Sequence, residues 1–164
     1  MAYELVRHHA EALERITKAE VEQLGQGMSS WSDVDGFGCY VSGPAWRLGR
    51  IGTACIERWA KSKDVWWRRA ALVSTVPLNA HGSEGDAART LQICTLLVAD
   101  REDMIVKALS WALRALAKRD PDAVKAFIDT YENSIAARAL RETRNWLRTG
   151  RKSGRSLVKA AQVS

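Results

Sequence analysis

The stretch KALSWALR, residues 107–114, decides the fold. Its apolar residues recur with the spacing of a helix that buries one side. Its first four residues align with Arg69-Ala70-Ala71-Leu72, 38 residues earlier, and with Arg138-Ala139-Leu140-Arg141, 31 residues later. A helical repeat with a period in this range is typical of HEAT or armadillo solenoids. We therefore predict an all-α solenoid of antiparallel helix pairs, although a compact helical bundle would show a similar number of helices.

Helical periodicity continues through nearly the whole chain. A capping box at Thr17 and Glu20 predicts a helix start, and Asp120-Pro121 places a proline in the first turn of another helix. Gly43-Pro44 and Pro77 are expected to end the helices that precede them. The predicted helices cover residues 2–14, 18–25, 30–43, 45–60, 65–76, 84–98, 102–118, 121–131 and 134–147, with a loop over 79–85.

Charge is concentrated at one end of the chain. The net charge is +6, and residues 138–164 hold eight of the 25 Lys and Arg but one of the 19 Asp and Glu. This predicts a helical domain over 1–149, a flexible basic tail over 150–164, and contact with a polyanion. Cys39, Cys55 and Cys94 are too far apart for a zinc motif and are predicted to be free thiols. Without a signal peptide or an apolar run long enough to span a membrane, we expect a cytoplasmic location and no membrane partner.

Trp31 and Asp35 lie four residues apart, which places them on one face of one helix. The indole offers a stacking surface. A carboxylate one turn away can stabilise positive charge that develops on a sugar. A buried tryptophan beside an aspartate placed by the helix dipole would give the same spacing. Spacing alone leaves both interpretations open.

Tryptophan and arginine also meet in Trp66-Trp67-Arg68-Arg69. Successive helical residues point about 100° apart, so one residue of each pair is expected in the core and the other at a groove. Trp111 falls outside the predicted buried stripe of its helix, which favours a position facing a groove. Arg69, Lys107 and Arg138 begin the three aligned segments, and they are either one phosphate contact per repeat or solvated helix starts.

The last predicted helix carries a basic stripe, which favours nucleic-acid contact over a merely solvated face. Its residues are Arg138, Arg141, Arg144 and Arg148. No phosphate-binding loop, dinucleotide glycine fingerprint or HExxH motif is present, and no nucleophile–histidine arrangement can be assembled.

Three runs resemble the DNA alkylation repair glycosylases of the AlkD type: residues 30–35, 64–71 and 107–114. Residues 120–124 and 139–142 resemble later repeats of that family, so the likeness extends from Tyr3 to Trp146. The resemblance implies a right-handed α-solenoid of HEAT-like helix pairs that holds duplex DNA in its concave groove. It also implies hydrolysis of the N-glycosidic bond of cationic alkylated purines, such as 3-methyladenine and 7-methylguanine, without metal or cofactor.

Matched by motif, Asp35 takes the position of the catalytic carboxylate. Trp31 and Trp111 take the flanking aromatic positions, and Arg69 that of the phosphate-binding arginine. The other groove and stripe residues are predicted from their spacing to contact DNA: Arg68, Trp67, Lys107, Arg138, Arg141, Arg144 and Arg148.

The chain departs from that family in length, because members usually have further repeats before the position of Met1. An uncapped solenoid end exposes apolar surface, so a homodimer through the N-terminal end is expected. Two other functions fit the residues less fully. One is a non-catalytic solenoid that recognises DNA shape or damage, and the other is a protein–protein scaffold.

Overall fold

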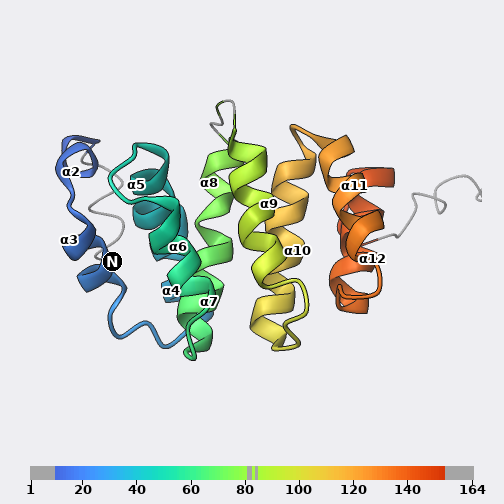
Figure 1. Cartoon of the computed structure of the whole chain (residues 1–164), viewed down its shortest axis with the longest axis horizontal. Coiled ribbons are helices and arrows are strands. Elements are labelled where there is room, and N and C mark those ends of the chain that lie inside the picture. The colour runs from blue at the N-terminus through green and yellow to red at the C-terminus, as the bar shows by residue number, and fades with distance from the viewer. Residues whose placement is uncertain (1–9, 81–82, 84, 154–164) are drawn as a thin grey trace, which may run out of the picture.

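A computed structural model describes residues 10–80, 83 and 85–153, and over these residues the chain is helical with no strand. The helices stand side by side in a row, with α3 near one end and α12 at the other (Figure 1). The all-α class is thus confirmed for the described part of the chain. The elements are α2 (Ala10–Arg15), α3 (Lys18–Gly25), α4 (Trp31–Phe37), the π-helix η1 (Gly38–Ser42), α5 (Gly43–Arg47), α6 (Thr53–Ala60), α7 (Val65–Val73), α8 (Thr75–Ala80), α9 (Asp86–Leu96), α10 (Asp103–Ala117), α11 (Pro121–Tyr131) and α12 (Ala137–Thr149).

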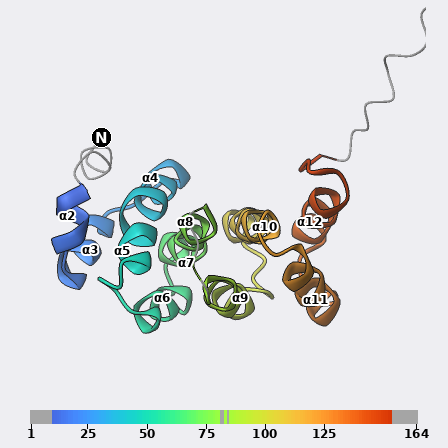
Figure 2. The same ribbon diagram turned by 90° about the horizontal axis from the view of Figure 1, so that it is seen from above.

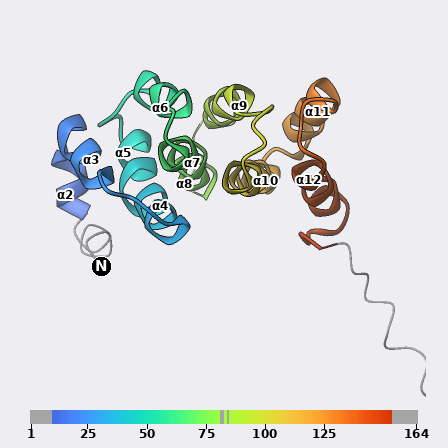
Figure 3. The same ribbon diagram turned by 90° about the horizontal axis from the view of Figure 1, so that it is seen from below.

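The row has two layers. Helices α6, α9 and α11 form one layer, and α4, α5, α7, α8, α10 and α12 form the other (Figures 2 and 3). Within the second layer, α4 contacts α7, α7 contacts α10, and α10 contacts α12. Both layers contribute to the core, with Ile56 and Ile93 from the first and Phe37, Leu72 and Leu109 from the second. The three aligned segments therefore lie on adjacent helices, α7, α10 and α12.

Local capping signals correctly predicted several helix starts. Both halves of the capping box between Thr17 and Glu20 are formed at the start of α3. The Ser30 hydroxyl accepts from the Asp33 backbone N–H at α4, and the Asp120 carboxylate accepts from Ala123 at α11. Each satisfies a backbone donor that a helix end would otherwise leave unpaired.

The predicted helix end at Gly43-Pro44 is wrong. The chain continues from α4 through η1 into α5, and Pro44 lies in the first turn of α5. The π-helical turn allows this because the Gly43 N–H bonds to the Gly38 carbonyl, five residues back. In the first turn of a helix, a missing proline N–H removes no intrahelical bond.

Three further boundaries were also predicted wrongly. The expected helix over 45–60 is two helices, because a turn with Gly49 at φ 71° separates α5 from α6. Pro77 does not end a helix; the break comes at Ser74, and Pro77 lies in the first turn of α8. As a result, Asn79 is helical rather than part of a loop. The last helix starts at Ala137, not at Ser134.

Two glycines bring α4–η1–α5 unusually close to α7–α8. A Cβ placed on Gly38 would lie 2.5 Å from Val73 Cγ1, and one on Gly43 would lie 2.7 Å from the Ser74 carbonyl oxygen. The buried hydroxyls of Ser42 and Ser74 are 2.6 Å apart across the same junction. This close approach fixes α4 against α7, the two helices that carry Asp35 and Arg69.

Some predictions concern residues beyond the described ranges. These are the first part of the predicted helix over 2–14, the proposed dimer contact made by those residues, and positions 154–164 of the basic tail. Within the described ranges, no helix is both long and apolar enough to cross a membrane. Cys39, Cys55 and Cys94 are free thiols, as predicted.

Candidate active site

Asp35 and Arg69 form a two-point ion pair between α4 and α7. Arg69 Nε donates to Asp35 Oδ1 at 3.0 Å, and Arg69 Nη2 donates to Asp35 Oδ2 at 3.1 Å. The Arg69 side chain is 6% exposed and that of Asp35 is 22% exposed. Such a fork holds a carboxylate in one orientation, because both nitrogens are fixed in the guanidinium plane.

Arg69 also reaches a third helix. Its Nη1 donates to the Met104 carbonyl of α10 at 2.6 Å, so one guanidinium joins α4, α7 and α10. Arg69 is therefore committed to protein partners in this structure. The adjacent Arg68 points elsewhere: it pairs with Asp100 at 2.9 Å and donates to the carbonyls of Ser62 and Lys63. Of the two arginines, Arg69 is the one beside Asp35.

Burial raises the pKa of Asp35 above its ordinary value, against the opposing charge and hydrogen bonds of Arg69. Cys39 lies one turn further along. Burial raises the pKa of its thiol to about 11, and the negative charge of Asp35 adds to the effect. The thiol therefore stays protonated at neutral pH, and Asp35 is the group of the pair that carries charge. A partly buried carboxylate is poorly solvated, so it interacts strongly with any positive charge brought next to it.

Trp31 lies one turn before Asp35 and is 59% exposed, although it is a large apolar side chain. It is thus not the core tryptophan that the alternative interpretation required. Trp111 is half-buried on α10, seven residues beyond the Met104 carbonyl that Arg69 holds. Seven helical residues span about 10 Å along the axis. The structure therefore joins Asp35 to Arg69 directly, while Trp111 lies about two turns further along the neighbouring helix.

Lys107 and Arg138 share a carboxylate rather than standing free. Asp103 pairs with Lys107 at 2.6 Å and with Arg138 at 3.1 Å. Arg138 also donates to buried Glu142, which accepts from the Ser110 hydroxyl at 2.6 Å. Burial opposes ionisation of Glu142, but the hydrogen bonds from Ser110 and Arg138 hold its pKa below the ordinary value. These contacts connect α10 to α12.

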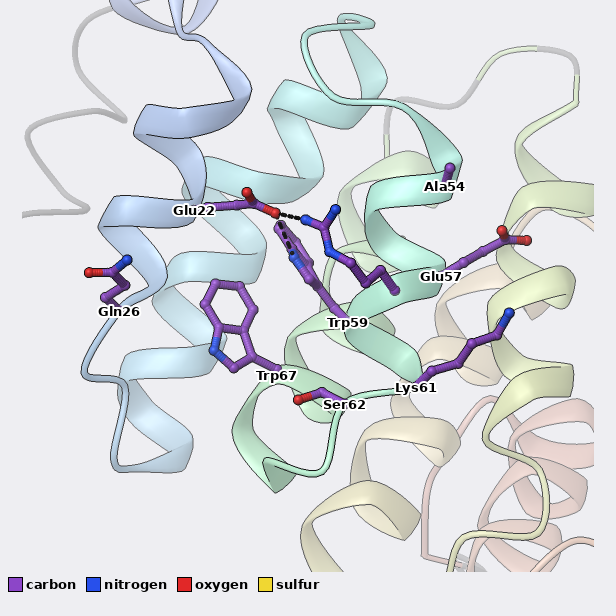
Figure 4. A pocket seen from close by; sticks show the side chains of 9 residues that line it. Glu22, Gln26, Ala54, Glu57, Trp59, Lys61, Ser62 and Trp67 are labelled. Atoms are coloured by element: carbon purple, nitrogen blue, oxygen red, sulfur yellow. Dashed lines mark hydrogen bonds and ion pairs between the residues drawn. The ribbon is translucent and has the colours of Figure 1, made fainter.

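Trp67 lies on the other side of α7 from Arg69. Its ring centroid is 4.9 Å from that of Trp59 and 5.9 Å from that of Phe37. It lines a pocket between α3, α6 and α7, where Glu22 accepts from Trp59 Nε1 at 3.3 Å (Figure 4). The structure therefore separates Trp67 from the Asp35–Arg69 pair, as the 100° step between helical residues requires.

Sequence reasoning missed two basic residues on α10. Arg114 and Lys118 follow Lys107 and Trp111 at steps of three and four residues, which places all four on one face of the helix. Arg114 and Lys118 lie 5.8 and 5.6 Å from the ring of Trp146. Extending the helical spacing beyond Lys107 would have identified them.

The basic stripe of α12 divides into two parts. Arg141 is two residues from each of buried Ala139 and Thr143, so it points away from α10. Arg144 and Arg148 follow it on that exposed side, where Arg144 pairs with Glu132 at 2.6 Å. Arg138 instead belongs to the network between α10 and α12. Among the described residues, Arg141 has no ion-pair partner.

The described helices thus form an all-α protein with a partly buried carboxylate beside an exposed indole and with cations along its helix faces. The chain belongs to the DNA alkylation repair enzyme family, whose family model matches residues 1–147. Neither the curated proteins nor the solved structures gave a match. The family assignment predicted from residues 30–35, 64–71 and 107–114 is confirmed.

Proposed function

We propose that this protein is a DNA glycosylase that hydrolyses the N-glycosidic bond of cationic alkylated purines in duplex DNA. The observation that carries the proposal is Asp35, a partly buried carboxylate oriented by Arg69 and one turn from the exposed ring of Trp31. Membership of the DNA alkylation repair enzyme family supports DNA as the substrate.

The chemistry requires little more than a fixed negative charge. An alkylated purine such as 3-methyladenine or 7-methylguanine is already a cation, so it leaves without a general acid. As the bond breaks, positive charge develops on the deoxyribose. Asp35 stabilises that charge, and its partial burial strengthens the interaction because little water screens it. Water then adds to the sugar carbon and loses a proton.

The other candidate residues hold the DNA or orient Asp35 and take no direct part in breaking the bond. Trp31 and Trp111 contact the deoxyribose and backbone at the lesion, where their rings attract positive charge. Arg69 holds the Asp35 carboxylate and, through Met104, the spacing of α4, α7 and α10. In this proposal it orients Asp35 rather than serving mainly as a phosphate contact, since its donors already have protein acceptors.

We infer that the helix row is a right-handed solenoid of HEAT-like pairs and that the layer with α4, α7, α10 and α12 faces the DNA. Exposed cations on that layer and on α12 then neutralise phosphates, and each contact adds salt-dependent affinity. Lys107, Arg114 and Lys118 supply these contacts on α10, and Arg141, Arg144 and Arg148 supply them at the end of the row. Arg138 supports Asp103 and Glu142.

One observation favours the non-catalytic alternative. Both oxygens of Asp35 already accept from Arg69, which is also how a purely structural ion pair looks. A carboxylate has about four acceptor sites, so two bonds leave capacity for a sugar cation. A DNA-binding solenoid without excision activity would bind duplex DNA but be indifferent to methylation.

Replacing Asp35 by Asn tests the assignment, because Asn keeps the shape and removes the charge. Asp35→Asn should lower the single-turnover release of methylated bases by roughly 100- to 1000-fold while duplex binding persists. Asp103→Asn is the matched control and should change release little, because Asp103 is 58% exposed and pairs at the surface. Release by the Asp35→Asn variant at the wild-type rate, or none from wild type, would exclude the proposed activity.

A further inference from the structure

Trp66 lies on the same side of α7 as Arg69, although the spacing of the sequence directed attention to its neighbour Trp67. Each helical residue is turned by about 100° from the one before it. Trp66 is therefore about 60° from Arg69, three residues on, and about 20° from Val73, seven residues on. Both Arg69 and Val73 face the segment formed by α4 and η1. The direction of the Trp66 side chain is thus toward α4.

The register between α4 and α7 brings Trp66 opposite Trp31. The ion pair of the candidate active site and the contact between Gly38 and Val73 follow in the same order along both helices, so α4 and α7 run parallel. Trp31 lies seven residues, or about two turns, before Gly38. Trp66 likewise lies seven residues before Val73. The two tryptophans therefore take matching positions, one turn before the carboxylate and the arginine of the pair.

The Trp66 ring has surface available to a substrate. It is partly exposed and packs only partly against the core, whereas the core indoles of Trp46 and Trp59 are 1% and 4% exposed. The Trp66 backbone N–H donates to the Asp64 carboxylate at 2.8 Å, which fixes the first turn of α7. Among the described residues, no ring contact joins Trp66 to Trp31. Neither ring face is used up by stacking on the other.

We propose that Trp66 is a specificity-determining residue that, with Trp31, flanks the nucleotide at Asp35 and favours the positive charge developing on its deoxyribose. The negative face of an indole ring attracts a cation, and more strongly where water is partly excluded. A carboxylate on α4 and aromatic rings from both α4 and α7 would then surround one sugar. The inference rests on the proposed function in placing a nucleotide of duplex DNA at Asp35.

Two duplexes that lack a base at one position test this preference for charge without requiring excision. In the first, the deoxyribose is replaced by a pyrrolidine ring, whose protonated nitrogen takes the place of the carbon that bears the base. In the second, it is replaced by a neutral tetrahydrofuran ring of the same size. Wild type should bind the cationic ring about 100-fold more tightly than the neutral ring, as expected for a mimic of the transition state.

Trp66→Phe and Trp66→Leu form a matched pair, because the new side chains are similar in size and only phenylalanine keeps an aromatic face. Trp66→Leu should lower the ratio of the two affinities by about 10-fold, as the loss of one partly desolvated cation–π contact implies. Trp66→Phe should keep most of the ratio. Both affinities are measured on the same protein, so a loss of folded molecules cancels in the ratio.

Trp67→Phe and Trp67→Leu are the controls at the adjacent position. The Trp67 ring packs on Trp59 and Phe37, on the other side of α7 from Arg69. Both variants should therefore keep the wild-type ratio, even where they lower stability. A smaller ratio in Trp67→Leu than in Trp66→Leu would mean that the wrong tryptophan of the two has been assigned.

The assignment of Trp66 and the proposed function can fail separately. Equal ratios for Trp66→Phe and Trp66→Leu would overturn the assignment, whether or not wild type excises methylated bases. If the two ratios differ as expected but wild type releases no methylated base, the glycosylase activity is wrong and the assignment stands. If wild type binds neither duplex, both proposals are wrong.

Discussion

Two aspartate–arginine pairs join neighbouring helices of the same layer, and they differ in how much water reaches them. Asp35 pairs with Arg69 between α4 and α7, and Asp103 pairs with Arg138 between α10 and α12. The partners in the first pair are 22% and 6% exposed, and those in the second 58% and 39%. Chemistry and spacing are nearly the same, because the partners are 34 and 35 residues apart in the chain.

The surroundings shift the pKa values of the two carboxyl groups in opposite directions. Burial raises the pKa of Asp35, whereas a hydrogen bond from Lys107, with the charges of Lys107 and Arg138, lowers the pKa of Asp103. Asp103 is thus an ordinary surface acid whose charge is already balanced. The pairing with Arg69 does not fully offset the burial of Asp35, so the positive charge of a sugar cation would stabilise its carboxylate further. Both carboxylates are paired with an arginine, so burial, more than pairing, distinguishes the candidate catalytic carboxylate Asp35 from Asp103.

Breaking the buried pair should have the largest effect on stability. Arg69→Met leaves Asp35 partly buried without its cation and frees the Met104 carbonyl. We expect the free energy of unfolding to fall by about 3 kcal/mol, which chemical denaturation would measure. The matched control is Arg144→Met, which breaks an exposed pair with Glu132 and should cost well under about 1 kcal/mol.

The double variant Asp35→Asn with Arg69→Met sharpens this result, because it removes the unpaired charge as well. It should be more stable than Arg69→Met alone. If Arg69→Met were no worse than Arg144→Met, the contrast between a buried and an exposed pair would be lost.

The sequence could predict features that depend on neighbouring residues, but not those that depend on contacts between distant parts of the chain. Caps are local, so Thr17 and Asp120 identified helix starts correctly. The junction at Gly43 was missed because its cause lies about thirty residues away in the chain, where Ser74 meets it. Spacing and the internal repeat drew attention to Asp35 and Arg69 but left their roles open, and only the family resemblance assigned those roles. Their ion pair follows from the packing of α4 on α7, which no short motif encodes.

Widening that junction should have an intermediate effect on the buried pair. A Cβ at Gly43 would meet the Gly38 and Ser74 carbonyl oxygens, both at 2.7 Å, and backbone cannot move aside cheaply. Gly43→Ala should therefore cost about 1–3 kcal/mol of stability and lower excision, since α4 must move from α7. Gly52→Ala, with open space around its Cβ and an ordinary φ of −88°, is the control. Equal stability of the two variants would mean that the close approach does not hold the site.

The smallest effect, a shift in a pH profile, tests the comparison most directly. Excision needs ionised Asp35, so the single-turnover rate should fall as the pH drops through its raised pKa, above the ordinary value of 3.8. Arg69→Gln removes the charge that opposes the rise and should move this acid limb to higher pH. Asp103→Asn should leave the limb where it is.

Loss of activity in acid can be told apart from acid unfolding, because protonating Asp35 has opposite effects on the two: it stops excision but stabilises the fold. Because the folded pKa of Asp35 is raised, the folded state binds more protons than the unfolded state between 3.8 and that pKa, so protonating Asp35 stabilises the fold. The stability contributed by Asp103 is instead lost as the pH falls through its lowered pKa, below 3.8. Excision should therefore disappear at a pH where circular dichroism still reports a folded protein. An acid limb that follows unfolding, or that stays unchanged in Arg69→Gln, would mean that Asp35 is no more poised for chemistry than Asp103.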